Sequence, residues 1–344
     1  MKIVNCHTHF VLPSYYNAVV EHHADKEDGF PMPTSWSIEE NLAFMDEVGV
    51  DISIMSLSTP HSFWGDVQES RNLCHTINTQ IAAEVKKYPN RFKFMAALPI
   101  PDAEGSIEET KYAMDELGAV GVKIPSNAQG IYLGNKMLEP LYEELNKRQA
   151  VVIIHPSRPP FLSEGVFTSG PMPIFEYLVD ESRTVIDILT AGVLDRYPDI
   201  KFILPHNGAF IPTVIDRLAR ISKHLVETGF MEKEAVRSIG KAESLILHSD
   251  QGWQYQHKIY QKLLKENGII QSMSRKGNCL DNTVIEKFFV LLKSELFYFD
   301  KFKSIEDFRE KLDEYIDYYN NRRIKVKLKE LSPVEYRTKS LHTA

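Results

Sequence analysis

Cysteine is scarce in this chain, with only Cys6, Cys74 and Cys279 among its 344 residues. Three scattered cysteines exclude the disulfide framework of a small secreted protein and are typical of a reducing compartment. The chain also lacks an apolar run long enough to cross a membrane, and its first residues form a strand pattern rather than a signal peptide. We therefore expect a cytoplasmic protein without a membrane partner.

Internal repeats and low-complexity linkers are missing as well, and the composition, 43% hydrophobic and 25% charged, is that of ordinary globular domains. Charge is unevenly distributed. Residues 1–235 hold about 20 basic and about 32 acidic residues, whereas residues 236–344 hold about 20 and about 15. The acidic front suits an enzyme. The basic last third suits either a nucleic-acid partner or a solvated helical surface.

From residue 1 to about 228 the sequence alternates between strand-like and helical patterns, and Ser37 with Glu40 forms a capping box before one helix. Strands separated by long helices predict a parallel sheet with crossover helices. Six such units are visible, two fewer than a closed eight-stranded barrel needs. The predicted strands are Lys2–Cys6, Asp51–Ser58, Phe92–Ile100, Ala119–Pro125, Ala150–His155 and Ile200–Pro205. The predicted helices are Ile38–Val48, Val67–Lys87, Ser106–Leu117, Lys136–Arg148, Phe175–Arg196 and Pro212–Val226.

Histidines stand at the ends of three of these strands. His7 and His9 are two residues apart on one strand and therefore share a face. His155 and His206 each end a later strand, and in a barrel all of these ends meet at one mouth. Imidazoles suit zinc and neighbouring divalent metals. A single such histidine is more often a hydrogen-bonded core residue, but three strand ends together favour a metal site.

Residues 1 to about 228 resemble the amidohydrolase superfamily, in the branch that contains aminocarboxymuconate-semialdehyde decarboxylase and related metal-dependent decarboxylases and hydrolases. The resemblance lies in His7-Thr-His9, His155-Pro156, residues 191–199, and the stretch from Pro205-His206 to Asp216-Arg217. It implies one divalent metal on His7, His9 and His155, with zinc expected first and manganese as the alternative. It also implies that His206 is the base that orients or deprotonates metal-bound water.

The same resemblance implies hydrolysis or decarboxylation of a small, carboxylated substrate. Lys123, Arg158 and Arg217 are the candidate substrate contacts, with a plain surface cation as the alternative for each. The family pattern also requires a metal-binding aspartate at the end of the last barrel strand. The chain leaves the pattern after the sixth unit, so we expect a truncated barrel and impaired activity.

After a junction at 229–240, residues 241–344 carry a different pattern. Asp250 ends a short apolar run, and Glu286 lies on a predicted helix after the basic loop 274–277, with 35 residues between the two acids. Paired carboxylates can hold two divalent metals for attack on phosphorus. A lone pair of acids at this spacing is a weak signal.

The segments around these acids closely resemble those of insertion-sequence transposases with a retrovirus-integrase-like core. The resemblance covers about 238–338, and the segments that carry it are 248–255, 271–278, Asp281-Asn282, Glu286-Lys-Phe-Phe289, 292–295 and 318–323. The resemblance implies part of a ribonuclease-H-like fold in which Asp250 and Glu286 are two of three acids that would bind magnesium. Arg275 and Lys276 would lie by the DNA backbone. The first acid has no counterpart upstream, so we do not expect strand transfer.

The predicted fold class is thus α/β: an incomplete TIM-like barrel of about six units, followed by a partial ribonuclease-H-like segment. Three hypotheses remain open. The chain is a fused reading frame with two incomplete sites, or a working hydrolase or decarboxylase whose second segment completes the barrel, or a DNA-binding fragment. A strand that ends in Asp250 is the feature that favours the second hypothesis.

Overall fold

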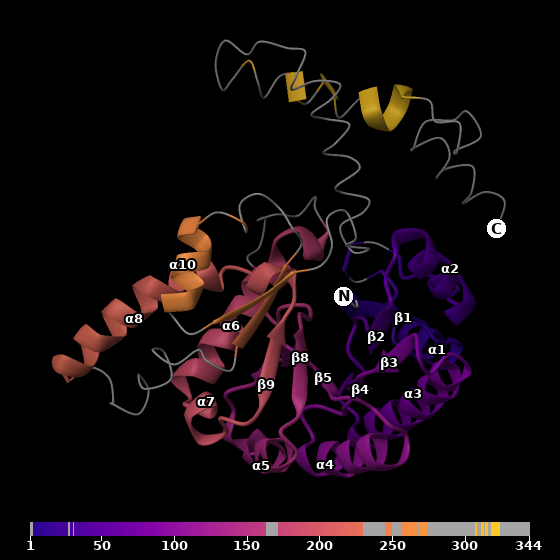
Figure 1. Ribbon diagram of the computed structural model, residues 1–344, viewed down its shortest axis with the longest axis horizontal. Coiled ribbons are helices and arrows are strands. Elements are labelled where there is room, and N and C mark those ends of the chain that lie inside the picture. Colours follow the sequence, from indigo (N-terminus) through magenta and orange to yellow (C-terminus); the bar gives the residue numbers. More distant parts are fainter. Residues whose placement is uncertain are drawn as a thin grey trace. The chain divides into compact units, whose positions relative to one another are not determined.

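The computed structural model describes residues 3–26, 28–29, 31–162, 171–229, 245–249, 256, 258–266 and 269–273, together with positions 307, 311–312, 314–315 and 318–323. The chain divides into two compact units, Met1–Asn278 and Cys279–Ala344. In the second unit the described residues include one π-helical turn, Tyr318–Arg322. All other elements below belong to the first unit (Figure 1). None of the helices in the described part is long and apolar enough to cross a membrane.

Parallel strands follow one another across the first unit. In spatial order they are β1 (Val4–Phe10), β2 (Ile52–Leu57), β3 (Phe92–Phe94) with β4 (Ala96–Ala97), β5 (Val122–Pro125), β8 (Val151–His155), β9 (Lys201–Leu204), β10 (Leu245–Ser249) and β11 (Ile270–Met273). Every pairing in this series is parallel. β3 and β4 are separated only by Met95, whose backbone N–H donates to Met55. The hydrogen-bonded sheets part at this point, since β1, β2 and β3 form one sheet and β4, β5, β8, β9, β10 and β11 form another. If β3 and β4 are taken as one strand, the described strands of the two sheets together give eight positions.

Helices lie outside these strands (Figure 1). They are α1 (Pro13–Glu21), α2 (Ile38–Val48), α3 (Val67–Lys87), α4 (Ala103–Lys111), α5 (Glu139–Lys147), α6 (Glu176–Thr190), α7 (Val193–Arg196), α8 (Ile211–Glu227) and α10 (Lys258–Glu266). A hairpin, β6 (Asn127–Ala128) with β7 (Ile131–Tyr132), follows β5. Ser37 caps α2 as predicted, since its hydroxyl accepts a hydrogen bond from the Glu40 N–H at 3.1 Å.

The predicted α/β, barrel-like architecture is confirmed, and each of the six predicted strand runs contains a strand. The predicted helix 175–196 is broken at Gly192, whose φ of 71° is left-handed and ends the helical path. The larger difference is that β10 and β11 join the same sheet. β10 pairs with β9, and β11 pairs with β10. The apolar run before Asp250 was assigned to the transposase-like segment, with completion of the barrel as one of three open hypotheses. The junction at 229–240 remains a prediction because residues 230–244 lie outside the described residues.

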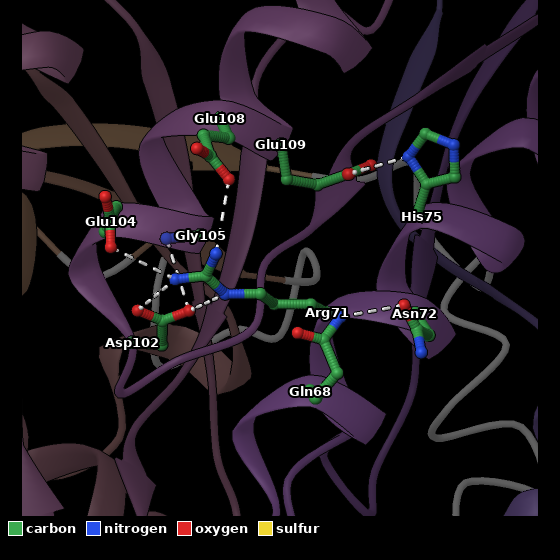
Figure 2. Close-up of polar contacts among 9 residues, drawn as sticks. All are labelled: Gln68, Arg71, Asn72, His75, Asp102, Glu104, Gly105, Glu108 and Glu109. Atoms are coloured by element: carbon green, nitrogen blue, oxygen red, sulfur yellow. Dashed lines mark hydrogen bonds and ion pairs between the residues drawn. The ribbon is translucent and has the colours of Figure 1, made fainter.

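Helix α3 is fixed to the sheet by a buried asparagine. Asn78 donates to the Ala97 carbonyl at 2.8 Å and to Glu109 at 2.7 Å, and accepts from the Ala97 N–H at 2.9 Å. Nearer the surface, Arg71 contacts the carboxylates of Asp102, just before α4, and of Glu104 and Glu108 on it. His75 lies 3.2 Å from Glu109 (Figure 2). The α3–α4 pair is therefore held in place by polar contacts as well as by apolar packing.

Replacing Asn78 with alanine should lower the free energy of unfolding by about 3 kcal/mol, because the Ala97 backbone and Oε1 of Glu109 would lose the hydrogen bonds that Asn78 makes to them in the interior. Urea unfolding measures the change. Asn72→Ala, on the exposed side of the same helix, is the matched control, and we expect it to change the stability by less than about 0.5 kcal/mol. Equal losses for the two variants would contradict this account.

Candidate metal centre and adjoining cavity

Three histidines converge at the carboxyl ends of the strands. His7 and His9 lie on β1 and His155 is the last residue of β8. One ligand nitrogen from each lies within 4.8 Å of the other two. The ring centroids are 4.7 Å apart for His7 and His9, 5.4 Å for His7 and His155, and 4.7 Å for His9 and His155. The structure thus brings together all three predicted metal ligands.

The protonation pattern of the rings fits a cation. Nδ1 of His155 lies 3.0 Å from the Pro156 carbonyl, and Nδ1 of His9 lies 3.3 Å from the Ser56 carbonyl. A carbonyl only accepts, so these contacts favour the tautomer with the proton on Nδ1 and a lone pair on Nε2, although Nδ1 of His9 also lies 3.5 Å from the Ser56 hydroxyl. These two Nε2 atoms are 3.2 Å apart. Two ligands of a tetrahedral metal at about 2.1 Å are separated by about 3.4 Å. The residues present therefore fit a divalent metal.

Electrostatics favour a neutral imidazole at His155. Burial, and then the neighbouring His9, holds the pKa of His155 well below its usual range. A neutral ring is the form that binds a metal. The carbonyl contacts at Nδ1 also fix how each ring is oriented toward the centre.

His206 adjoins this centre, with its ring centroid 5.0 Å from that of His7 and 5.6 Å from that of His155. Its Nδ1 lies 3.0 Å from Oε2 of Glu181, a fully buried carboxyl on α6. Burial raises the pKa of Glu181, and the adjacent His206 opposes that shift. A carboxylate on Nδ1 sets the tautomer and leaves the other ring nitrogen for chemistry. Glu181 was not predicted as a site residue, although a charged residue on the apolar face of a predicted helix could have indicated it.

A cavity of about 420 Å³ opens at the same edge of the sheet. Its walls come from the loops that follow β2, β5 and β8. Aromatic and proline side chains form much of the lining, with neutral polar groups and one cation among them. The lining includes His61, Phe63, Trp64, Asn127, Ser157 and Arg158. A flat, partly apolar molecule with an anionic group suits such a lining.

Asp180, next to Glu181 on α6, ties two walls of this cavity together. Its buried carboxylate accepts hydrogen bonds from Ser126, from Asn127 at 2.8 Å and from Tyr132. Ser126 Oγ in turn accepts from the Ser157 N–H at 2.8 Å. Two neighbouring acids on one helix therefore serve different parts of the site, one the cavity and the other His206.

The predicted substrate contacts lie in three different settings. Arg158 is exposed and lines the cavity. Arg217 is exposed on α8, away from the cavity lining. Lys123 is only 1% exposed on β5, and its Nζ donates to the Ser58 carbonyl at 3.3 Å. Burial lowers the pKa of Lys123 to about 7. A substrate role for each of these residues remains a prediction.

The predicted transposase-like site residues lie outside the described residues. They are Asp250, Glu286, Arg275 and Lys276. Their roles remain predictions.

Two family models match the chain. The amidohydrolase model matches residues 4–259, and the integrase core domain model matches residues 286–341. Decarboxylase macB of Penicillium terrestre is 33% identical over 260 residues, which are 72% of this chain and 75% of that protein. The putative transposase InsK of insertion element IS150 from Escherichia coli is 56% identical over 110 residues, or 32% of this chain. The matched part spans only 39% of that transposase.

Solved structures give the same picture for the front of the chain. The crystal structure of an amidohydrolase II superposes with a TM-score of 0.71 and 28% identity, covering 85% of this chain and 92% of that one. The 5-carboxyvanillate decarboxylase of Novosphingobium aromaticivorans, complexed with manganese and 4-hydroxy-3-methoxy-5-nitrobenzoic acid, superposes with a TM-score of 0.68 at 22% identity, covering 79% and 86%. The latter likeness concerns the fold.

The buried Lys123 makes stability depend on pH. Its pKa is about 7 in the folded protein and near 10.5 in the unfolded chain, so the unfolded chain binds more protons between these values. The free energy of unfolding should therefore rise with pH across this window, by at most about 1.4 kcal/mol per pH unit from this group. Lys123→Met removes the contribution. We expect the variant to be more stable than the parent near pH 7, with an advantage that vanishes toward pH 10.

Urea unfolding of both proteins across this pH range measures the difference, in which the other titrating groups cancel. Lys136→Met, at an exposed position, is the control, and its difference from the parent should not vary with pH. A Lys123→Met difference that is constant with pH would show that the buried amine does not lose its proton in this range.

Proposed function

Because the chain belongs to the amidohydrolase family and carries an integrase-core transposase fragment behind that domain, we propose that it is a metal-dependent decarboxylase of small carboxylated aromatic compounds. The observation that carries the proposal is the group of His7, His9 and His155 beside His206. The loop that follows His155 lines a cavity and carries Arg158. The printed names of the similar proteins favour decarboxylation over hydrolysis.

The chain's own residues supply what such a reaction needs. Loss of carbon dioxide from an aromatic acid breaks the bond between ring and carboxylate, and the ring carbon then takes up a proton. As an imidazolium, with its Nδ1–H facing Glu181, His206 would deliver that proton from Nε2 and end as the neutral ring, to be reprotonated from solvent. Arg158 would meet the anionic group, and the aromatic walls would hold the ring. A bound divalent metal would polarise the substrate oxygens.

We propose zinc or manganese as the divalent metal that the three histidines bind. Three imidazoles suit zinc, and the structural neighbour with 5-carboxyvanillate decarboxylase activity in its name holds manganese. We also propose a cytoplasmic location, because scarce cysteines, of which Cys6 and Cys74 are free, suit a reducing compartment.

A second candidate function, DNA binding, rests on the integrase-core match and the 56% identity to a transposase. The basic last third of the chain would then contact DNA phosphates, with Arg275 and Lys276 among the contacting residues.

Purified protein should retain about one divalent metal per chain after dialysis, as measured by elemental analysis. His155→Ala should lower metal affinity at least about 100-fold, because it removes one of three nitrogen ligands. His75→Ala is the matched control, since His75 is an exposed histidine on α3 that contacts Glu109.

With zinc or manganese restored, the parent should release carbon dioxide from hydroxylated benzoic acids, and His206→Gln should lose most of that turnover while keeping its metal.

The outcomes separate the parts of the proposal. Metal without carbon dioxide release, for either ion, would contradict decarboxylation and leave the metal centre in place. A parent protein without metal would overturn both. The same elemental analysis on Asp250→Ala tests whether this acid belongs to the barrel site, since lower occupancy would assign it there.

DNA binding should depend steeply on salt. If the basic last third contacts phosphates, affinity for a short duplex should fall more than about tenfold between about 50 and 200 mM salt. Replacing Arg275 and Lys276 together with alanine should weaken binding and flatten the salt dependence. Fluorescence anisotropy measures both, with Lys262→Ala on α10 as the control. Absence of binding at low salt would exclude this function.

A further inference from the structure

The turn that carries His206 has an unusual backbone. His206, Asn207, Gly208 and Ala209 have φ values of 50°, 61°, 71° and 53°, all in the left-handed region that glycine tolerates best. Three of the four are not glycine, and each such residue costs about 1 kcal/mol or more. Such a turn persists only where its surroundings fix it. The groups that hold this turn therefore also determine where His206 lies.

Helix α6 holds one side of the turn. Glu181 contacts Nδ1 of His206, and the Ser182 hydroxyl accepts a hydrogen bond from the Phe210 N–H at 2.9 Å. These contacts fix the ring and the residue that follows the turn, but not the glycine between them.

Strand β10 holds the other side. Leu247 is fully buried and packs directly on Gly208, so closely that a Cβ on that glycine would lie 2.3 Å from Leu247 Cδ2. In the sheet, Leu247 is the register partner of Leu204, two residues before His206. The leucine thus contacts the turn and lies beside the strand that leads into it.

These contacts cross the boundary between the two resemblances. Two of the segments that resemble transposases begin within these strands, 248–255 within β10 and 271–278 within β11. Nevertheless β10 and β11 occupy the seventh and eighth positions of the strand series, next to β9 (Figure 1). Leu264 and Ile269, which lie on and just after α10, are buried in the same core as Leu247.

We propose that the β10–α10–β11 segment, although similar to a transposase, serves as the last two strands of the amidohydrolase barrel, and that its Leu247 is a positioning residue for His206. The segment replaces strands that the front of the chain lacks, and the packing of Leu247 on Gly208 keeps the His206 turn in its strained conformation. The role in catalysis rests on the proposed function, whereas the structural role does not.

The test uses the full chain and two leucine variants. Leu247→Ala removes the contact with Gly208, and Leu247→Met keeps its volume. Ile270→Ala is the matched control, because Ile270 lies on β11 and is 53% exposed. The readout is the imidazole nitrogen spectrum of histidine-labelled protein, with the His206 signals assigned by their loss in His206→Gln. Glu181→Gln serves as the positive control, since it changes the partner of Nδ1.

We expect Leu247→Ala to shift or broaden the His206 signals and to lower the urea midpoint, while Leu247→Met and Ile270→Ala resemble the parent. If turnover is present, Leu247→Ala should lower kcat about tenfold or more with little change in KM, because a displaced proton donor slows the chemical step more than binding. Should Leu247→Ala fail to fold, Gly208→Ala tests the same contact from the other side and should disturb the same signals.

His206 signals and a urea midpoint in Leu247→Ala that match the parent's would overturn the proposal, as would equal responses in Leu247→Ala and Ile270→Ala. If no variant releases carbon dioxide but the His206 signals still depend on Leu247, the proposed function fails and the positioning role stands.

Discussion

The site depends on one constraint, the convergence of three imidazoles on a single point at the carboxyl edge of a parallel sheet. His9 and His155 each present a bare Nε2 because their Nδ1 atoms face backbone carbonyls, and these two lone pairs lie 3.2 Å apart. Lone pairs at that distance repel unless a cation or a proton lies between them. The placement of β1 and β8, which belong to the two different sheets, therefore matters to the chemistry as well as to stability.

His206 lies in a second environment beside the three-histidine centre. His206 contacts the rings of His7 and His155, yet it is held by groups from two other elements, Glu181 on α6 and Leu247 on β10 through Gly208. The backbone of its turn is costly, so the surrounding packing must supply what local preference does not. The residue that we propose as proton donor thus relies on the part of the barrel whose sequence resembles a transposase.

Sequence similarity and strand pairing point in different directions in the β10–β11 region. Residues 248–255 and 271–278 resemble a transposase. A parallel sheet, however, accepts any strand of suitable length with apolar residues, because its hydrogen bonds are made by the backbone. Short apolar runs in a foreign segment can therefore extend a barrel sheet from β9, whatever their origin.

The sequence by itself determined the α/β alternation, the six front strands and the four histidines of the site, because apolar periodicity and residues at strand ends are local properties. Asp180, Glu181 and the contact of Leu247 with Gly208 were decided only by the tertiary structure. Their partners lie 25 to 54 residues away along the chain, and no local pattern records which buried acid meets which loop. Local preference also could not place β10 and β11, since the edge that a strand joins depends on which neighbour it pairs with in space.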